Sequence, residues 1–480
     1  MALSITFPDT RTNDQSGPAT GTKPRRAKCI GLLKSALLLT AVLLARPSQA
    51  QVPSWQWAAQ SMGSGIGQLK SLAVDAEGNS YQVGFFTETI QFGSTTLVSQ
   101  GRSDVFVAKL SSAGTWEWAV AVGSAGSDNA AGVAIDAAGR IFISGSFSDQ
   151  VRFGATTLTS QGDMDVFVAQ ISPLGTWDWA TAAGGSGLDL ARALATTANG
   201  DVVVSGQFAD TAAFGATQLM SIGGEDAFVA RLEPNGQWQW AIGVGSPGND
   251  EVTALAVDKA GDVYTTGYFS TRAQFGTTAL IGRGMDDAFV GKLNKRGQWL
   301  WATVATATNT AYGKGIAVDP AGGVFVTGSF SGGAQFGATQ LFSNSSDDGF
   351  VARLTNKGQW EWVAVLASDY LDSIVGIALG QTGQLHVAGT FSRTIRGGAF
   401  QLTSRGHQDV FVGSLTRQGA WLGLTSGGGT ATDETQAMAL APGGGLFIGG
   451  DFSSAATFGA TQLQSGTAAA QVCIGRVSVP

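Results

Sequence analysis

The chain has 480 residues, with 28 Lys or Arg against 35 Asp or Glu, so its net charge is −7. An acidic chain without a basic stripe argues against nucleic acid and anionic lipid as partners. Charged residues make up only 13% of the chain and glycine numbers 69, as expected for a turn-rich all-β protein.

The first 50 residues have the order of a secretory signal peptide. A basic stretch, Lys23 to Lys34, precedes an apolar run of 11 residues, Ser35 to Ala45, and Ser48-Gln49-Ala50 fits a cleavage site. A membrane-spanning helix needs about 20 apolar residues, so we expect no membrane span after cleavage. We predict an exported protein that begins at Gln51 and resides in the periplasm, on the outer surface or outside the cell.

Cleavage changes the cysteine content and the charge of the chain. Cys29 leaves with the signal peptide, so only Cys473 remains and no internal disulfide can form. Cys473 lies in an apolar stretch and is expected to be a small buried hydrophobe. Removal of seven basic and two acidic residues leaves a net charge of −12.

From residue 54 to the end, the chain repeats itself every 61 residues. Phe-Gly pairs and single glycines keep this step, and the residue that marks each copy most clearly is a tryptophan. These tryptophans are Trp55, Trp116, Trp177, Trp238, Trp299, Trp360 and Trp421. A fixed period of this size indicates an array of one supersecondary unit.

The third copy illustrates the predicted elements in chain order. The alternating segment 177–180 predicts one strand, 190–196 a second, 202–208 a third and 226–232 a fourth, all joined by Gly-rich turns. Residues 214–221, which begin with Phe-Gly, predict a small extra hairpin or a structured loop. Four antiparallel strands without a helical period favour a β-propeller blade.

The array neither starts nor stops at the boundary between two predicted blades. The chain enters at Trp55, in what is normally the last strand of a blade, and ends with Val472 to Val479, normally the strand before it. The N-terminal strand can therefore complete the last blade and remove an exposed edge. We predict an all-β protein in which residues 51–480 form one closed, seven-bladed β-propeller, with a linear β-solenoid as the alternative.

Several repeated motifs resemble a known family. They are Asp-x-Phe-Val-Ala-x-Leu at 104, 165 and 226 (with isoleucine in the last place at 165), the Asn-Gly-x-Trp-x-Trp-Ala turn and strand, the run at 316–330 and Phe-Gly-x-Thr-x-Leu. Together they resemble the bacterial SBBP-type β-propeller repeat over essentially all of 54–480. This resemblance implies an extracytoplasmic or cell-surface protein without an assigned activity.

Most recurring residues are explained by the scaffold. All 13 tryptophans occupy two repeat positions, with Gly423 replacing one, and packing between blades accounts for them. The acids Asp75, Asp136, Asp258 and Asp319 precede a turn glycine and are expected to accept backbone hydrogen bonds. A second series starts a strand in six of the seven copies and has the same expected role; its members are Asp104, Asp165, Asp226, Asp287, Asp348 and Asp409.

A third acidic series is the candidate ligand-binding site. Its members lie in the Gly-rich loop that enters each inner strand, and in a propeller these loops and the Phe-Gly inserts should share one face around the channel mouth. The series consists of Asp128, Asp189, Asp250, Asp372 and Asp433, with Gly67 and Ala311 interrupting it. Two roles remain open, an acidic rim for a cation or a polyhydroxylated ligand, and caps that each hold their own turn.

Signals for catalysis, cofactors and metals are absent from the sequence. No Asp-x-Asp-x-Asp-Gly loop or nucleophile elbow occurs, and acids from separate blades are too far apart to share calcium. The two histidines, His386 and His407, have no metal-ligand spacing and no assigned role. We therefore predict no catalytic residues, no metal and no cofactor.

The sequence thus predicts an extracytoplasmic binding or interaction module for an envelope polysaccharide or a protein. Carboxylates that meet only in the fold leave a propeller glycosidase or lyase, with acids at the channel mouth, as the alternative. A purely structural envelope component is a third possibility. A cluster of unlike polar residues from different blades would favour an enzyme, and near-symmetric loops would favour a binding scaffold.

Overall fold

The computed structural model describes residues 52–343, 347–368, 370, 372–466 and 469–479. These residues form 40 β-strands and no helix, which confirms the all-β prediction. The predicted signal peptide at 1–50 lies outside the described residues. Within the described part of the chain, no helical segment has the length and apolarity of a membrane span.

Each copy of the repeat contributes four principal strands, which we call inner, second, third and outer. The inner strands are β2 (Gly67–Val74), β8 (Asn129–Ile135), β14 (Asp189–Thr196), β18 (Glu251–Val257), β24 (Ala311–Val318), β30 (Asp372–Leu379) and β36 (Asp433–Leu440). The second strands are β3 (Ser80–Phe86), β9 (Ile141–Phe147), β15 (Val202–Phe214), β19 (Val263–Phe269), β25 (Val324–Phe330), β31 (Leu385–Phe391) and β37 (Leu446–Phe452).

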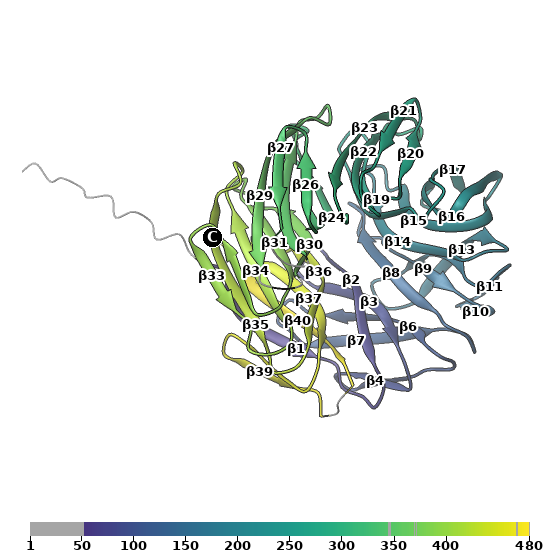
Figure 1. Ribbon diagram of the computed structural model, residues 1–480. Helices are drawn as coiled ribbons and strands as arrows, with labels where there is room; N and C mark the ends of the chain where they lie inside the picture. Colours follow the sequence, from purple (N-terminus) through teal and green to yellow (C-terminus); the bar gives the residue numbers. More distant parts are fainter. Residues whose placement is uncertain (1–51, 344–346, 369, 371, 467–468, 480) are drawn as a thin grey trace, which may run out of the picture. The chain divides into compact units, whose positions relative to one another are not determined.

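The third strands are β6 (Asp104–Leu110), β12 (Asp165–Ile171), β16 (Thr217–Leu232), β22 (Asp287–Leu293), β28 (Asp348–Leu354), β34 (Asp409–Leu415) and β40 (Gln471–Ser478). The outer strands are β1 (Ser54–Gln60), β7 (Trp116–Val122), β13 (Trp177–Gly185), β17 (Trp238–Val244), β23 (Trp299–Ala307), β29 (Trp360–Ser368) and β35 (Trp421–Gly429). Within a sheet the four follow one another antiparallel, as in the order β2-β3-β6-β7 (Figure 1).

The Phe-Gly insert forms a small hairpin between the second and third strands. These hairpins are β4–β5 (Thr89–Phe92, Thr95–Val98), β10–β11 (Gln150–Phe153, Thr156–Thr159), β20–β21 (Arg272–Phe275, Thr278–Ile281), β26–β27 (Gly333–Phe336, Thr339–Phe342), β32–β33 (Thr394–Gly397, Phe400–Thr403) and β38–β39 (Ala455–Phe458, Thr461–Gln464). A hairpin can extend the sheet of the preceding copy, as β26 does on β23, which links neighbouring sheets.

The third copy differs from the separate strands that its sequence predicted. β15 and β16 run through the insert without a break, because the pair Ala209↔Glu225 continues the ladder between the two strands. The predicted strand 202–208 therefore extends to Phe214, and the strand predicted at 226–232 begins at Thr217.

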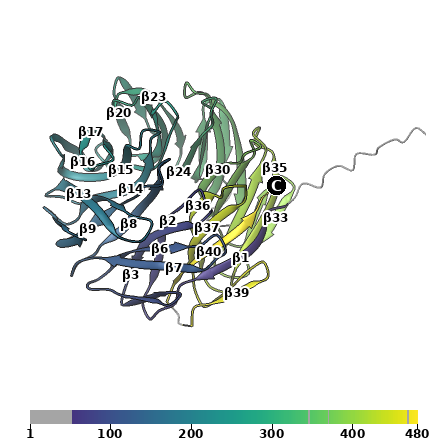
Figure 2. The same cartoon turned by 180° about the vertical axis from the view of Figure 1, so that it is seen from behind.

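The two ends of the repeat array pair with each other, as predicted. β1 lies antiparallel to β40, from Ser54↔Ser478 to Gln60↔Cys473, and the sheet has the order β1-β40-β37-β36. One strand from the start of the array thus completes three strands from its end (Figure 2). Without β1, the backbone of β40 would present an unpaired edge.

The inner strands contact one another from copy to copy. In chain order β2 lies against β8, and the succession continues through β14, β18, β24 and β30 to β36, which also lies against β2. Figures 1 and 2 place these strands at the centre, with the outer strands at the periphery.

The tryptophans join neighbouring copies. Trp116 packs edge-on against Phe92 at 4.8 Å between ring centroids, and its Nε1 donates to the carbonyl oxygen of Gln60 in β1 (3.0 Å). The second tryptophan of a copy covers a glycine of the next outer hairpin, as Trp118 covers Gly175. Scaffold packing, as predicted, is therefore the role of these indoles.

Gly423, which stands where the seventh tryptophan of this kind is expected, has a structural reason. A Cβ at Gly423 would lie 3.2 Å from the Cδ of Pro53. The segment that leads into β1 therefore occupies the space that an indole fills elsewhere.

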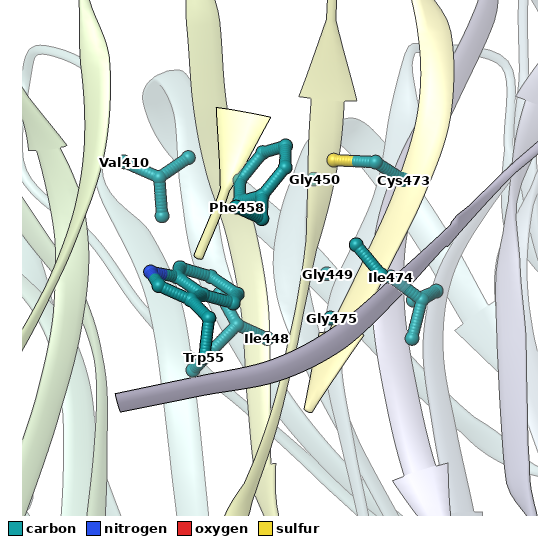
Figure 3. Close-up of a pocket in the computed structure, with 10 residues that line it drawn as sticks. Trp55, Val410, Ile448, Gly449, Gly450, Phe458, Cys473, Ile474 and Gly475 are labelled. Carbon is teal, nitrogen blue, oxygen red and sulfur yellow. The ribbon is translucent and has the colours of Figure 1, made fainter. Parts of the chain in front are cut away.

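The junction between β1 and the last copy is apolar (Figure 3). Trp55 packs edge-on against Phe458 at 4.8 Å, and its Nε1 donates to the carbonyl oxygen of Ser426 in β35 (3.1 Å). A cavity of about 10 Å³, the space of one water, lies between these rings and Cys473. Cys473 is a buried free cysteine, as predicted, and burial raises the pKa of its thiol.

The sixth copy departs from the pattern in ways that its packing explains. Gly397 replaces the repeated phenylalanine, and its partner across the hairpin, Phe400, is the aromatic residue instead. His386 is buried, and its Nδ1 lies 2.9 Å from the Oγ of Ser414. Burial lowers the pKa of His386 to about 4, so it is a neutral core residue near neutral pH.

Candidate functional site

The loops between copies and the insert hairpins lie on the same side of the molecule, as predicted. The N–H of Arg102, which follows the insert hairpin β4–β5, donates to the carbonyl oxygen of Gly126 in the loop between β7 and β8 (2.8 Å). Met62, in the loop between β1 and β2, pairs with Gln91 of the same insert hairpin. We call this side the loop face. The opposite side carries the turns that join principal strands within a sheet, such as 75–79 and 111–115. We call it the hairpin face, and the insert hairpins do not lie on it.

The predicted ligand-binding acids lie beneath the loop face. Each ends the loop before an inner strand, and the side chains of Asp128, Asp189, Asp250 and Asp433 are at most 1% exposed. The Oδ2 of Asp128 accepts hydrogen bonds from the backbone N (2.6 Å) and the Oγ (2.8 Å) of Ser124. Its Oδ1 accepts from the N–H of Ser148 (3.1 Å).

The other members hold their loops in the same way. Asp189 accepts from the N–H of Gly185 (2.8 Å), Asp250 from Ser246 (2.6 Å) and Asp433 from Gly429 (2.6 Å). Asp372 begins β30, and its side chain lies outside the described part. These contacts fit the capping role. Ligand binding by the carboxylates stays a prediction, and their burial means that it would require the loops to open.

The acids that begin the third strands lie beside these caps. Asp165 accepts from the N–H of Gln161 (3.1 Å), which confirms its turn-capping role, while its Oδ1 has no partner among the described residues. Carboxyl oxygens of Asp165 and Asp189 both lie 2.8 Å from where a Cβ would stand at Gly184. Burial, opposed by backbone hydrogen bonds, raises the pKa of Asp165 to about 6 and that of Asp189 to about 7.

The inner strands carry a second repeated feature, a β-bulge at the same position of every copy. The register of each inner strand shifts by one residue there, and a bulge re-aims a side chain. The bulged residues, which we call the bulge column, are Lys70, Ala131, Arg192, Thr253, Lys314, Val375 and Gln436. The β-bulge recurs in every copy, whereas the charge and polarity of the bulged residue differ between copies.

A pocket of about 360 Å³ opens where three inner strands meet at the loop face. Lys70 and Arg192 stand on its two sides, and Ala131 between them leaves the space. Phe85, Met164 and Leu190 contribute apolar walls. The volume falls within the range of small-ligand sites.

Acids and tyrosines follow Arg192 along the ends of the next strands at the loop face, and we call this region, together with the pocket, the mouth. The Nε of Arg192 pairs with Glu251 (3.0 Å), which also accepts from the hydroxyl of Tyr268 (3.3 Å). Tyr268 packs edge-on against Tyr312 at 5.1 Å, and the hydroxyl of Tyr312 donates to Asp286 (2.8 Å). Burial raises the pKa of Glu251, and Arg192 opposes this shift.

Lys314 is the third cation of the bulge column. Its Nζ lies 2.8 Å from the Oγ of Ser373, and burial lowers its pKa. The mouth therefore has a pocket between two cations on one side and a network of acids, tyrosines and one buried lysine on the other.

The sequence did not predict these residues as a site, because its predictions rest on residue types that recur at one position in most copies, whereas these residues differ from copy to copy. The signal was present: aligning the copies at 61 residues places lysine, alanine and arginine in one column at 70, 131 and 192. What the sequence could not indicate is that these residues lie at β-bulges and that three of them line one pocket.

Another difference between copies lies on the insert hairpins, where three consecutive copies expose a large apolar side chain. Met220, Ile281 and Phe342 occupy one repeat position in three consecutive copies and are 75%, 67% and 67% exposed. Exposed apolar groups at matching positions are typical of contact surfaces. No group of three or more His, Cys, Asp or Glu side chains that could hold a metal ion occurs in the described part.

Comparison with known proteins identifies the repeat. Residues 300–329 match the family model described as SBBP, a beta-propeller repeat. An uncharacterized WD repeat-containing protein of Acanthamoeba polyphaga mimivirus is 18% identical over 71% of this chain, and the match spans about a third (31%) of that protein's length.

Two solved structures are similar in outline. The WD40 domain of Neurospora crassa Pan2 is 10% identical, with a TM-score of 0.43, and the match covers 90% of this chain and 96% of that domain. A structure of YCF48 bound to D1 peptide is 12% identical, with a TM-score of 0.42, and the match covers 91% of this chain and all of that one.

Proposed function

Because residues 300–329 form an SBBP-type beta-propeller repeat, we propose that the whole array is a closed, seven-bladed β-propeller. Three observations support this architecture. The repeat marker occurs seven times, β1 pairs with β40, and β36 contacts β2 as each inner strand contacts the next. Closure leaves no unpaired principal strand at the ends of the array.

We propose that this propeller is a binding module and that its ligand meets the mouth at the loop face. The observation that carries this proposal is the bulge column: one position, presented by every inner strand, holds seven residues of six types. A repeated scaffold with a variable column suits recognition. The exposed Met220, Ile281 and Phe342 offer apolar contacts to a protein partner.

Two ligand classes follow from the sequence, an envelope polysaccharide and a protein. The purified protein should retain members of one class from arrays of polysaccharides, peptidoglycan and peptides. Substitution of Lys70 and Arg192 by glutamine should reduce retention, and Lys259→Gln on the hairpin face is the matched control. Retention that is unchanged in the double variant would contradict a site at the mouth.

The same arrays test the enzymatic alternative. Glu251, with its raised pKa, and Asp286 at the same mouth are the acids that a glycosidase or lyase would use. A binding module should release no product. Released sugar or peptide fragments would replace the binding proposal with an enzymatic one.

We further propose that the protein is exported and acts in the periplasm, on the outer surface or outside the cell. The pattern within residues 1–50 supports export. When the full chain is expressed in a bacterium with a general secretion system, mass spectrometry should find the mature N-terminus at Gln51. An intact chain in the cytoplasm would contradict export, and an Ala50→Arg variant should block cleavage.

A further inference from the structure

We propose that the pocket between Lys70 and Arg192 binds a carboxylate of an acidic peptide segment whose neighbouring residues are apolar. This inference rests on the proposed binding function and deepens it by naming the ligand chemistry. The chain is acidic overall, yet this pocket is lined by two cations and by no acid.

The geometry of the inner strands creates the pocket. Lys70, Ala131 and Arg192 are the bulged residues of three neighbouring inner strands, and all three line the pocket. A large residue at the middle position would fill the space, whereas alanine leaves it open. The result is a hollow of about 360 Å³ with a cation on either side.

The charge on Lys70 is available to a ligand. Its Nζ lies over the ring of Phe85, 5.4 Å from the centroid, and among the described residues it forms no ion pair. The positive charge of Lys70 acts to lower the pKa of Asp451. The carboxyl of Asp451 is buried, however, and it accepts a hydrogen bond from the N–H of Leu69 (2.7 Å). Burial raises the pKa of Asp451 to about 7, so it is only partly ionised near neutral pH.

Arg192 is held in position for the same task. Its Nε pairs with Glu251 (3.0 Å) and its Nη2 donates to Gln207 (3.2 Å), while its side chain stays 40% exposed. Its Nη1 forms no hydrogen bond with the described residues. A guanidinium anchored on one edge can present the other edge to a carboxylate.

The walls of the pocket favour a peptide over a polysaccharide. Met164, Leu188 and Leu190 are apolar, and Asn129 and Ser146 are the main uncharged polar side chains. A sugar would bring several hydroxyl groups, each of which needs a hydrogen-bond partner when buried. An acidic side chain that enters the pocket while its peptide backbone stays outside needs only the two cations and the apolar walls.

The test is a library of amidated hexapeptides built from apolar residues, glycine and serine. One position is Asp or Glu in half of the members and Asn or Gln in the other half. The immobilised protein should retain acidic members at least about tenfold more strongly than their amide counterparts, and added salt should reduce this preference. Equal retention of the two halves would overturn the inference.

Variants tie the preference to the pocket. Lys70→Gln and Arg192→Gln should each remove most of the preference, Lys70→Arg should keep it, and Ala131→Leu should block the pocket without changing charge. Lys259→Gln, an exposed lysine on the hairpin face, should have no effect. A preference that survives both Lys70→Gln and Ala131→Leu would overturn the assignment to this pocket.

The outcomes separate this inference from the function on which it rests. Oligogalacturonate, a polysaccharide with carboxylates, should compete less well than the retained peptides, and stronger competition would overturn the choice of a peptide. Retention of neutral ligands alone would overturn the inference and leave the binding module standing. If no ligand class is retained, both proposals fail.

Discussion

Deletion of residues 51–60 should lower the Tm of the protein by about 10 °C, because the last sheet loses its outer strand. The deletion removes β1 and with it the pairs from Ser54↔Ser478 to Gln60↔Cys473. It also removes Trp55 and Trp57, and burying one indole contributes up to about 4–6 kcal/mol. Differential scanning calorimetry of the two proteins measures the effect.

One substitution in β1 and the reactivity of Cys473 test whether the loss of stability comes from the contacts that β1 makes with the last sheet. Trp55→Ala should lower the Tm by a smaller amount in the same direction, since it removes the edge-on contact with Phe458 and the hydrogen bond to Ser426. Both changes should also expose Cys473, which ought to be inert to thiol reagents in the intact protein.

The matched control is Ser54→Ala, which loses only an exposed hydrogen bond between Ser54 and Ser478 (2.7 Å) and should leave the Tm within about 1 °C. An unchanged melt and an unreactive Cys473 after the deletion would refute the stabilising role of β1.

Much of the fold could be predicted from the sequence because its causes are local and repeated. Alternation at Trp177 and Trp179, turn glycines and a constant step of 61 residues locate the strands in every copy. The pairing of β1 with β40 followed from phase alone. The continuous β15 and β16 did not follow, because the Ala209↔Glu225 pair depends on tertiary register.

The candidate site was harder to predict, for a physical reason. The acids near the loop face attract notice because they repeat, yet repetition is what the scaffold requires: Asp128 and Asp250 hold backbone N–H groups under the loops. Recognition needs groups that differ from copy to copy. Lys70 and Arg192 differ in this way, but only the bulge reveals that they face one pocket.

Asp189→Asn should stabilise the protein at about pH 8 and do so much less at about pH 5. In the folded state burial raises the pKa of Asp189 to about 7, whereas the ordinary value is 3.8. Between these values the unfolded chain loses its proton while the folded chain keeps it, so the free energy of unfolding falls as the pH rises. The loss is nearly complete about one pH unit above the folded-state pKa and amounts to roughly 4 kcal/mol.

Asparagine avoids this loss because it carries no charge, and its side-chain oxygen can still accept from the N–H of Gly185. The wild-type protein should itself melt at a higher temperature at about pH 5 than at about pH 8, since burial raises the pKa of Asp128, Asp250 and Asp433 to about 6 as well. Asp178→Asn, on the exposed side of β13, is the control and should shift the Tm equally at both pH values. If Asp189→Asn destabilises the protein more at pH 8 than at pH 5, the carboxyl is ionised in the folded state, and its charge strengthens the cap rather than weakening it.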